Sequence, residues 1–119
     1  MIEFEEYKVK LNTLKPTLDS LKDALHLEAA EKEIEELEGQ SARDGFWNDV
    51  ENSQRVQKRL KQLKSKAENY QRLCAQWDDL MTLCEMAIEE NDDSMLPELQ
   101  SDFSALEEHL EETRLGTLL

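Results

Sequence analysis

Apolar residues recur at alternating steps of three and four through most of this chain, the spacing of one helix face. The longest such run predicts a helix from about residue 49 to 90, about 60 Å long. Its seam keeps a period of 3.5 residues, which is typical of coiled-coil packing. The seam consists of Val56, Leu60, Leu63, Ala67, Tyr70, Cys74, Trp77, Met81, Cys84 and Ile88. In the second half Leu73, Leu80 and Ala87 widen the seam, so we expect that half to contact more than one helix.

A first helix is predicted over about residues 2–25, from a seam that keeps its phase on both sides of Pro16. The seam consists of Phe4, Tyr7, Leu11, Leu14, Leu18, Leu21 and Leu25. A proline inside a helix removes one hydrogen bond and costs about 3 kcal/mol. We therefore expect a kink at Pro16, and a complete break is the less favoured alternative.

The seam loses its phase after Leu25, and Leu27 begins a new stripe of apolar residues. This change predicts a sharp bend near His26, although histidine is not itself a helix breaker. The new stripe predicts a short, glutamate-rich second helix over about residues 27–38. Gly39 is expected to end it in a left-handed conformation.

A fourth helix is predicted over about residues 94–115, after the polar turn "ENDDS". Ser94 is the expected N-cap, and Pro97 is tolerated in the first turn. The seam of this helix consists of Leu96, Leu99, Phe103, Leu106 and Leu110. Gly116 is expected to end the helix, and the leucines after it suggest that the natural chain continues.

These elements predict an all-α fold, an elongated antiparallel bundle or coiled-coil hairpin of four helices. The 119 residues suit one domain and include only three glycines and two prolines. Short connections place neighbouring helices antiparallel. The fourth helix should therefore lie on the second half of the long helix and the short helix on its first half. The first helix should fill the remaining side.

The charge balance excludes several classes of function. The net charge of −14 argues against free DNA as the main ligand, because the overall field repels phosphate.

No apolar run approaches the roughly 18 residues that span a bilayer, and no signal peptide is visible, so we expect a cytoplasmic protein. Cys74 and Cys84 would lie about 15 Å apart on one straight helix, too far for a disulfide. We expect both to be reduced core thiols.

No pattern of catalytic or metal-binding residues stands out. His26 and His109 are isolated, and Leu106 stands where a di-metal carboxylate bundle would need a glutamate. The cluster "EENDD" at 89–93 lacks the spacing and central glycine of a calcium-binding loop. The three glycines are scattered, so there is no phosphate-binding loop. We expect a protein that is not an enzyme and that carries no metal or cofactor.

Half of the 14 basic residues fall on the long helix. Arg59, Lys64 and Lys66 flank its apolar seam, where they can pair with glutamates of the second helix. Four others point away from the seam: Arg55, Lys58, Lys61 and Arg72. These four are available to an anionic partner such as structured RNA, and the alternative is that they are simply solvated.

Two apolar residues of the long helix, Leu83 and Met86, lie off its seam and close to Met95 and the acidic turn. An apolar patch rimmed by acidic residues is a possible protein-docking surface. Burial under the first helix is the equally supported alternative.

The stretch "GFWNDVENSQ" (residues 45–54) is the most loop-like part of the chain. Asn48 or Asp49 can cap the long helix. We expect Phe46 and Trp47 to fold back over the apolar end between the second and third helices, because buried aromatic rings remove a large apolar area from water. A contact with a partner is the alternative role for the pair.

This stretch, with the acidic helix before it and the heptad helix after it, resembles the bacterial peptide chain release factor 2 family. That family has an Asp-Phe-Trp-Asp-Asp-Pro-Glu-x-Ala-Gln-like segment at this place. The resemblance extends over residues 1–119 as the N-terminal helical domain of a larger factor. Asp44 and Gly45 stand where the family tends to have Pro-Asp, Val50 where it has Pro, and Gly116 where arginine is usual.

The resemblance implies a docking role in translation termination, near the ribosomal stalk base and the GTPase centre, where the GTPase release factor acts. In such factors a Gly-Gly-Gln loop promotes hydrolysis and a Ser-Pro-Phe motif reads the stop codon, and neither tripeptide occurs here. The alternative is a stand-alone coiled-coil module for protein interaction or oligomerisation. Heptad helices also pair between chains, so the sequence leaves the oligomeric state open.

Overall fold

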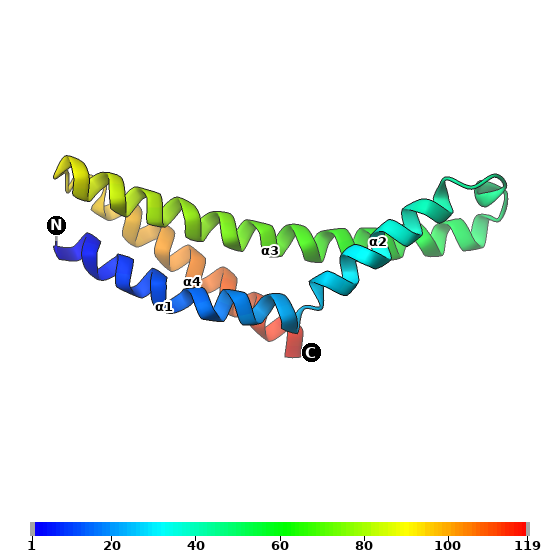
Figure 1. Cartoon of the computed structure of the whole chain (residues 1–119), viewed down its shortest axis with the longest axis horizontal. Coiled ribbons are helices and arrows are strands. Elements are labelled where there is room, and N and C mark those ends of the chain that lie inside the picture. The colour runs from blue at the N-terminus through cyan, green and yellow to red at the C-terminus, as the bar shows by residue number, and fades with distance from the viewer. Residues whose placement is uncertain (1, 119) are drawn as a thin grey trace.

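The computed structural model describes residues 2–118, which form one elongated all-α molecule measuring 62 × 28 × 19 Å. The elements of this range are α1 (Ile2–Ala24), α2 (Leu27–Ser41), the short 3₁₀ turn η1 (Phe46–Asn48), α3 (Val50–Glu90) and α4 (Leu96–Leu118). Helix α3 runs the whole length of the molecule (Figure 1). Helices α1 and α4 lie along its second half, and α2 lies along its first half. The predicted four-helix antiparallel arrangement, with one helix of about 40 residues, is confirmed.

The three helices α1, α3 and α4 share the larger hydrophobic core, and we call this part of the molecule the bundle. Its fully buried side chains include Phe4, Leu11, Leu18, Leu73, Cys84, Leu99 and Leu106. The residues that widen the α3 seam, Leu73, Leu80 and Ala87, are more buried here than Cys74, Trp77 and Met81. The second half of α3 therefore does contact two helices, as its broad apolar face predicts.

Two aromatic side chains of α3 also tie α1 to the bundle through hydrogen bonds. The Trp77 indole Nε1–H donates to the Leu11 carbonyl oxygen at 2.6 Å. The Tyr70 hydroxyl donates to the Leu18 carbonyl oxygen at 3.0 Å. Each ring thus fills the space between the helices while its polar atom is satisfied, which avoids the cost of a buried unpaired donor.

Helix α1 continues through Pro16 without interruption, so a complete break there is excluded. The proline removes the donor that would bond the Asn12 carbonyl. Asn12 and Pro16 are both exposed, so water can satisfy that carbonyl. The buried residues Leu11 and Leu18 hold the two halves of the helix on the same face of α3.

The predicted bend between α1 and α2 occurs at His26, which adopts a left-handed conformation with φ 55° and ψ 44°. Its carbonyl already accepts the first hydrogen bond of α2, from the Ala30 N–H at 2.9 Å. Left-handed backbone costs a non-glycine residue roughly 1–2 kcal/mol. Burial of Leu25 and Leu27 on either side offsets that cost, because each joins the bundle core.

The smaller hydrophobic core lies between α2, η1 and the first half of α3, and we call this part the arm. Its buried residues are Ala30, Leu37, Phe46, Val56 and Leu63. Ile34 and Leu60 pack against them from α2 and α3. The arm is thus two helices thick where the bundle is three.

The glycine stops predicted for α2 and α4 are wrong. Helix α2 passes through Gly39 and ends at Ser41, with the Ala42 N–H bonded to the Gly39 carbonyl at 3.3 Å. Helix α4 likewise passes through Gly116 to Leu118. Both glycines keep helical backbone, since a glycine ends a helix only when the next turn requires positive φ. The glycine with positive φ is Gly45, at 81°, and it precedes η1 in the loop after α2 instead of ending a helix.

Helix α3 ends where the sequence predicts, but the following cap differs. Asn91 is left-handed at φ 51°, and the Asp92 N–H bonds to the Ala87 carbonyl at 2.9 Å, which satisfies the end of α3. Ser94 is not the N-cap of α4, because the first hydrogen bond of that helix runs from the Leu99 N–H to the Met95 carbonyl at 3.0 Å. Ser94 belongs to the turn before it, where its N–H donates to the Asp92 side chain at 2.9 Å. The helix begins two residues later, at Leu96, so Pro97 does lie in its first turn.

Candidate docking surfaces

The loop at the free end of the arm separates the two adjacent aromatic residues. Phe46 is buried, with 8% of its surface exposed, whereas Trp47 is 57% exposed. The rings meet edge to face, with centroids 5.0 Å apart and an interplanar angle of 83°. Consecutive residues of a 3₁₀ turn point about 120° apart, so both rings cannot face the same core. The prediction that the pair folds back is correct for Phe46 and wrong for Trp47.

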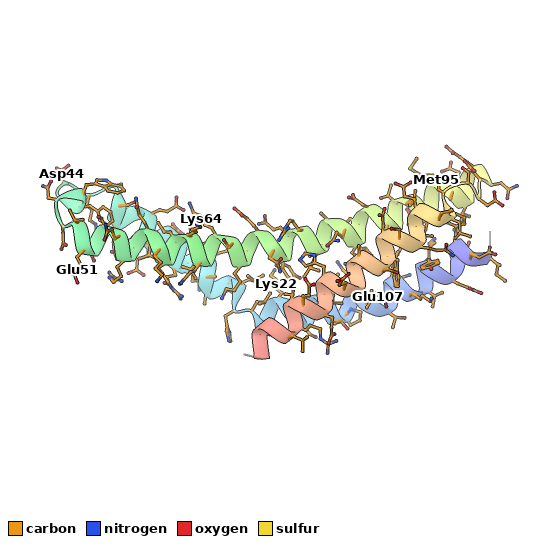
Figure 2. All side chains as sticks on the ribbon, turned by 180° about the vertical axis from the view of Figure 1, so that it is seen from behind. Lys22, Asp44, Glu51, Lys64, Met95 and Glu107 are labelled. Atoms are coloured by element: carbon orange, nitrogen blue, oxygen red, sulfur yellow. The ribbon has the colours of Figure 1, made fainter. Side chains whose placement is uncertain are left out.

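Asp49, not Asn48, caps the long helix. The Asp49 Oδ1 accepts a hydrogen bond from the Asn52 N–H at 3.1 Å, while Asn48 is the last residue of η1. Val50 follows the cap and is 60% exposed. The acidic residues Asp44 and Glu51 lie at the same end of the molecule (Figure 2). The tip therefore presents exposed apolar side chains among carboxylates.

One flank of the basic stretch on α3 pairs with α2, as the heptad positions predict. The Arg59 Nε and Nη2 donate to both oxygens of Glu33, at 2.6 and 2.9 Å, and these bonds hold the pKa of the Glu33 carboxyl below its ordinary value. Lys64 lies 3.7 Å from Glu38. Lys66 makes no ion pair within residues 2–118, although its charge also favours ionised Glu33.

The outer face of α3 carries the other four basic residues, and all four are exposed: Arg55, Lys58, Lys61 and Arg72. Residues 54–66 contain six basic residues and no acidic one, in a chain whose net charge is −14. The Arg55 and Arg72 guanidinium groups each donate to an asparagine one turn earlier on the helix, at 2.9 Å. Their predicted outward position is confirmed, and we call these four residues the basic face.

A groove of about 340 Å³ runs between α3 and α4 on the bundle. Seven residues line it: Gln76, Asp79, Leu80, Leu83, Glu98, Asp102 and Ala105. Leu83 is half-buried against the bundle core, while Met86, one turn further along α3, remains 48% exposed. Burial under the first helix, one of the two alternatives for this pair, is therefore wrong for Met86.

A polar cluster lies along the same helix interface, beyond Gln76. The His109 Nε2 is 2.7 Å from the Asn69 Oδ1, and its Nδ1 is 2.5 Å from the Gln76 Oε1. Asn69 donates to the Thr113 hydroxyl at 2.9 Å and accepts from Arg72, so its amide orientation is fixed. The His109 Nε2 must therefore carry a proton, and neutral His109 requires Gln76 to turn its NH₂ group towards Nδ1.

Within residues 2–118, no three His, Cys, Asp or Glu side chains gather closely enough to hold a metal ion. Both cysteines are free thiols, and burial raises the pKa of Cys84. The described helices include none that is long and apolar enough to cross a membrane.

Comparison with known proteins places this arrangement in a family. Residues 30–119 match the PCRF domain. The chain belongs to the PCRF domain family. The match begins within α2, so the arm and the α3–α4 hairpin form the family's part of the molecule. Helix α1, which completes the bundle core, lies outside it.

Relatives of the PCRF domain extend the similarity to α1. The chain is 32% identical to peptide chain release factor 2 of Lactiplantibacillus plantarum over 118 residues, which cover 99% of the chain and 31% of that relative. It is 33% identical to the same factor of Clostridium perfringens strain SM101, over 100% of the chain and 32% of the relative. It is 36% identical to that of Acidothermus cellulolyticus, over 92% and 30%. The chain thus spans about a third of each relative's length. No solved structure matches it.

The PCRF domain contains one set of candidate residues that the apolar pattern does not reveal. The groove residues Asp79, Glu98, Asp102 and Ala105 come together only when α4 folds back on α3. The sequence does carry a signal for them, because the chain has no lysine or arginine between Arg72 and Arg114. Such a long acidic stretch indicates a surface of one sign, although not its shape.

Proposed function

We propose that this chain is the non-catalytic docking domain of a stop-codon-dependent peptide chain release factor, and that it contributes to ribosome contacts during translation termination. The observation that carries the proposal is the PCRF domain match over residues 30–119, together with relatives named peptide chain release factor 2 that align along almost the whole chain. A cytoplasmic location follows from the same role.

A docking role also suits the shape of the molecule. Its interior is filled by apolar seams, and the described surface offers shallow grooves between helices. The chain contains neither Gly-Gly-Gln nor Ser-Pro-Phe. We therefore assign peptide release and codon reading to the parts of the factor that this chain does not span, and we assign positioning to the helical rod.

The basic face is the part of the rod that we propose to contact ribosomal RNA, near the stalk base and the GTPase centre. Lysine and arginine side chains bind phosphates by displacing counterions, which makes such contacts dependent on salt. Arg55, Lys58, Lys61 and Arg72 are exposed on one side of α3, and the first three lie within residues 54–66, which contain no acidic residue. The GTPase release factor is a second partner in this proposal, through the apolar residues Leu83 and Met86.

Co-sedimentation with ribosomes at low and moderate salt tests the proposal. The chain is expected to pellet with ribosomes at low salt and to dissociate as salt is raised. The double variant Lys58→Gln/Lys61→Gln should bind more weakly, and its salt dependence should fall by about one unit of log–log slope per lost phosphate contact. The matched control is Lys22→Gln/Lys32→Gln, which removes the same charge from exposed sites on α1 and α2.

Two results would contradict the proposal. Equal losses in the two double variants would mean that total charge, not the basic face, governs binding. Failure to bind ribosomes at low salt, together with self-association at micromolar concentration, would support a stand-alone coiled-coil module.

A further inference from the structure

The α3–α4 hairpin carries negative charge without compensation. Between Arg72 and Arg114 the chain has 13 aspartate and glutamate residues and neither lysine nor arginine. These residues form the second half of α3, the connecting turn and most of α4. The basic residues Lys8, Lys10, Lys15 and Lys22 of the bundle lie on α1, which packs on α3 and α4 but does not line the groove between them.

The floor of this groove is apolar, and its two sides are formed by one stretch of α3 and one stretch of α4 of equal length. Leu80 and Leu83 come from α3, and Ala105 comes from α4. The lining of α3 spans residues 76–83 and that of α4 spans residues 98–105, which correspond to about two helical turns, or roughly 10 Å. Ala105 is exposed and small, so another backbone can approach α4 closely at this point.

The rim of the groove is acidic on both sides. Asp79 lies on the α3 side, and Glu98 and Asp102 lie one turn apart on the α4 side. None of these three carboxylates makes an ion pair within the described residues 2–118. The groove thus combines an apolar floor with carboxylates that have no basic partner from this chain.

We propose that this groove binds a basic amphipathic helix of a partner protein. About two turns of such a helix would place apolar side chains on Leu83 and Ala105, above the buried Leu80, as in other helix-in-groove complexes. Lysine or arginine residues flanking its apolar stripe would reach the carboxylates on both rims. Met86, exposed one turn beyond Leu83, would extend the apolar contact towards the α3–α4 turn.

Charge and packing exclude two other occupants. RNA phosphates would be repelled by the three rim carboxylates and by the surrounding acidic surface. A second copy of this chain lacks a suitable free helix, because its own basic stretch, residues 54–66, already buries its apolar residues Val56 and Leu63 against α2. The inference rests on the proposed function only where it uses Leu83 and Met86, the residues assigned above to a protein partner. It is separate from RNA binding, since Arg55, Lys58 and Lys61 lie on the first half of α3 and Arg72 does not line the groove.

Fluorescence anisotropy with a labelled synthetic peptide tests the groove directly. The probe is a helical peptide of about 16 residues with a leucine stripe flanked by lysine and arginine, measured at about 0.15 M salt to screen long-range attraction. The variant Asp79→Asn/Asp102→Asn should weaken binding about five- to tenfold, since each exposed ion pair contributes modestly. Ala105→Trp, which fills the groove, should weaken binding by more than about tenfold.

The matched control is Asp78→Asn/Glu107→Gln, which removes the same charge from positions of α3 and α4 outside the groove lining. It should change affinity by less than about twofold. Equal weakening by the two double variants would overturn the proposal, as would equal binding of a scrambled peptide with no apolar stripe. Absence of binding, or a dimer of the chain that Ala105→Trp dissociates, would also overturn it. Ribosome co-sedimentation of the groove variants should be unchanged, which separates this inference from the proposed function.

Discussion

At the residue scale, His109 links the folded state to pH. Burial is the main cause that lowers its pKa below the ordinary 6.5, and the charge of Arg72 adds to the effect while Glu112 opposes it. The unfolded chain therefore takes up a proton at a higher pH than the folded chain does. The stability that neutral His109 contributes is complete at pH values above about 6.5, the ordinary pKa of the unfolded state. It is lost as the pH falls through the lower pKa of the folded state.

We expect the denaturant midpoint of the wild-type chain to fall between pH 7.5 and pH 5, and to fall less in His109→Gln. Chemical denaturation followed by circular dichroism at a series of pH values measures both curves. The control is His26→Asn, which removes an exposed histidine from a left-handed position that asparagine tolerates. An unchanged pH dependence in His109→Gln would show that the carboxylates alone cause the trend.

Trp47 should report a water-exposed environment. In a Trp77→Phe variant, the remaining Trp47 fluorescence is expected at long wavelength and should be quenched readily by acrylamide, because more than half of the side chain is exposed at 57%. The Trp47→Phe variant provides the comparison, since its remaining Trp77 is half-buried and bonded to Leu11. Blue-shifted Trp47 emission would mean that the ring folds into the arm core after all.

The aromatic pair shows what a sequence pattern can and cannot predict about single residues. The amount of apolar area correctly indicates that the loop is anchored, and Phe46 provides the anchor. Heptad spacing says nothing about a 3₁₀ turn, so it could not distinguish Phe46 from Trp47. The left-handed backbone of His26 could not be predicted from the apolar pattern either. The loss of phase shows where the chain bends but not the backbone conformation that produces the bend.

At the scale of elements, the arm depends on a small number of buried side chains. Leu63 is 2% exposed and belongs to a core with four other buried residues. Leu63→Ala is expected to lower the free energy of unfolding by about 2–5 kcal/mol, as large-to-small changes in cores do. The same change at Leu115, which is 52% exposed, should stay within about 0.5 kcal/mol. Thermal and denaturant melts of both variants measure the difference, and equal effects would contradict the assignment of the arm core.

The helices themselves follow directly from the apolar seams, whereas their ends do not. A long seam must be buried along its whole length, so its period determines the helix that carries it. Past the last seam residue only local terms decide, and glycine costs a helix just about 1 kcal/mol relative to alanine. This is why α2 and α4 pass through Gly39 and Gly116. It is also why the apolar seam of α4 does not show that the helix begins at Leu96 and not directly after Ser94.

At the scale of the whole molecule, the bundle and the arm should differ in local stability. The bundle core joins three helices, while the arm core joins α2, η1 and one half of α3. Regions with fewer buried contacts open at lower free energy. Native-state hydrogen exchange should therefore show less protection for amides of α2 than for those of α1 and of the second half of α3. Equal protection in the two parts would indicate that the chain unfolds as a single cooperative unit.

The basic face and the groove differ in how far the sequence alone can predict them. The basic face lies on one helix, so helical spacing alone predicts it. The groove is formed by two helices. Asp79 of α3 and Asp102 of α4 line it together only because the turn at residues 91–95 folds α4 back along α3. Pairing of helices, which depends on geometry as well as on pattern, creates that surface.

Helix α3 belongs to both the arm and the bundle, and this has a mechanical consequence. An unbroken helix of 41 residues is stiff, and at about 1.5 Å per residue it holds its two capped ends about 60 Å apart. Partners bound at opposite ends of this helix would therefore be held at a fixed separation. A rotation of only about 5° at one end would displace the other by roughly 5 Å, so small movements reach the far end enlarged.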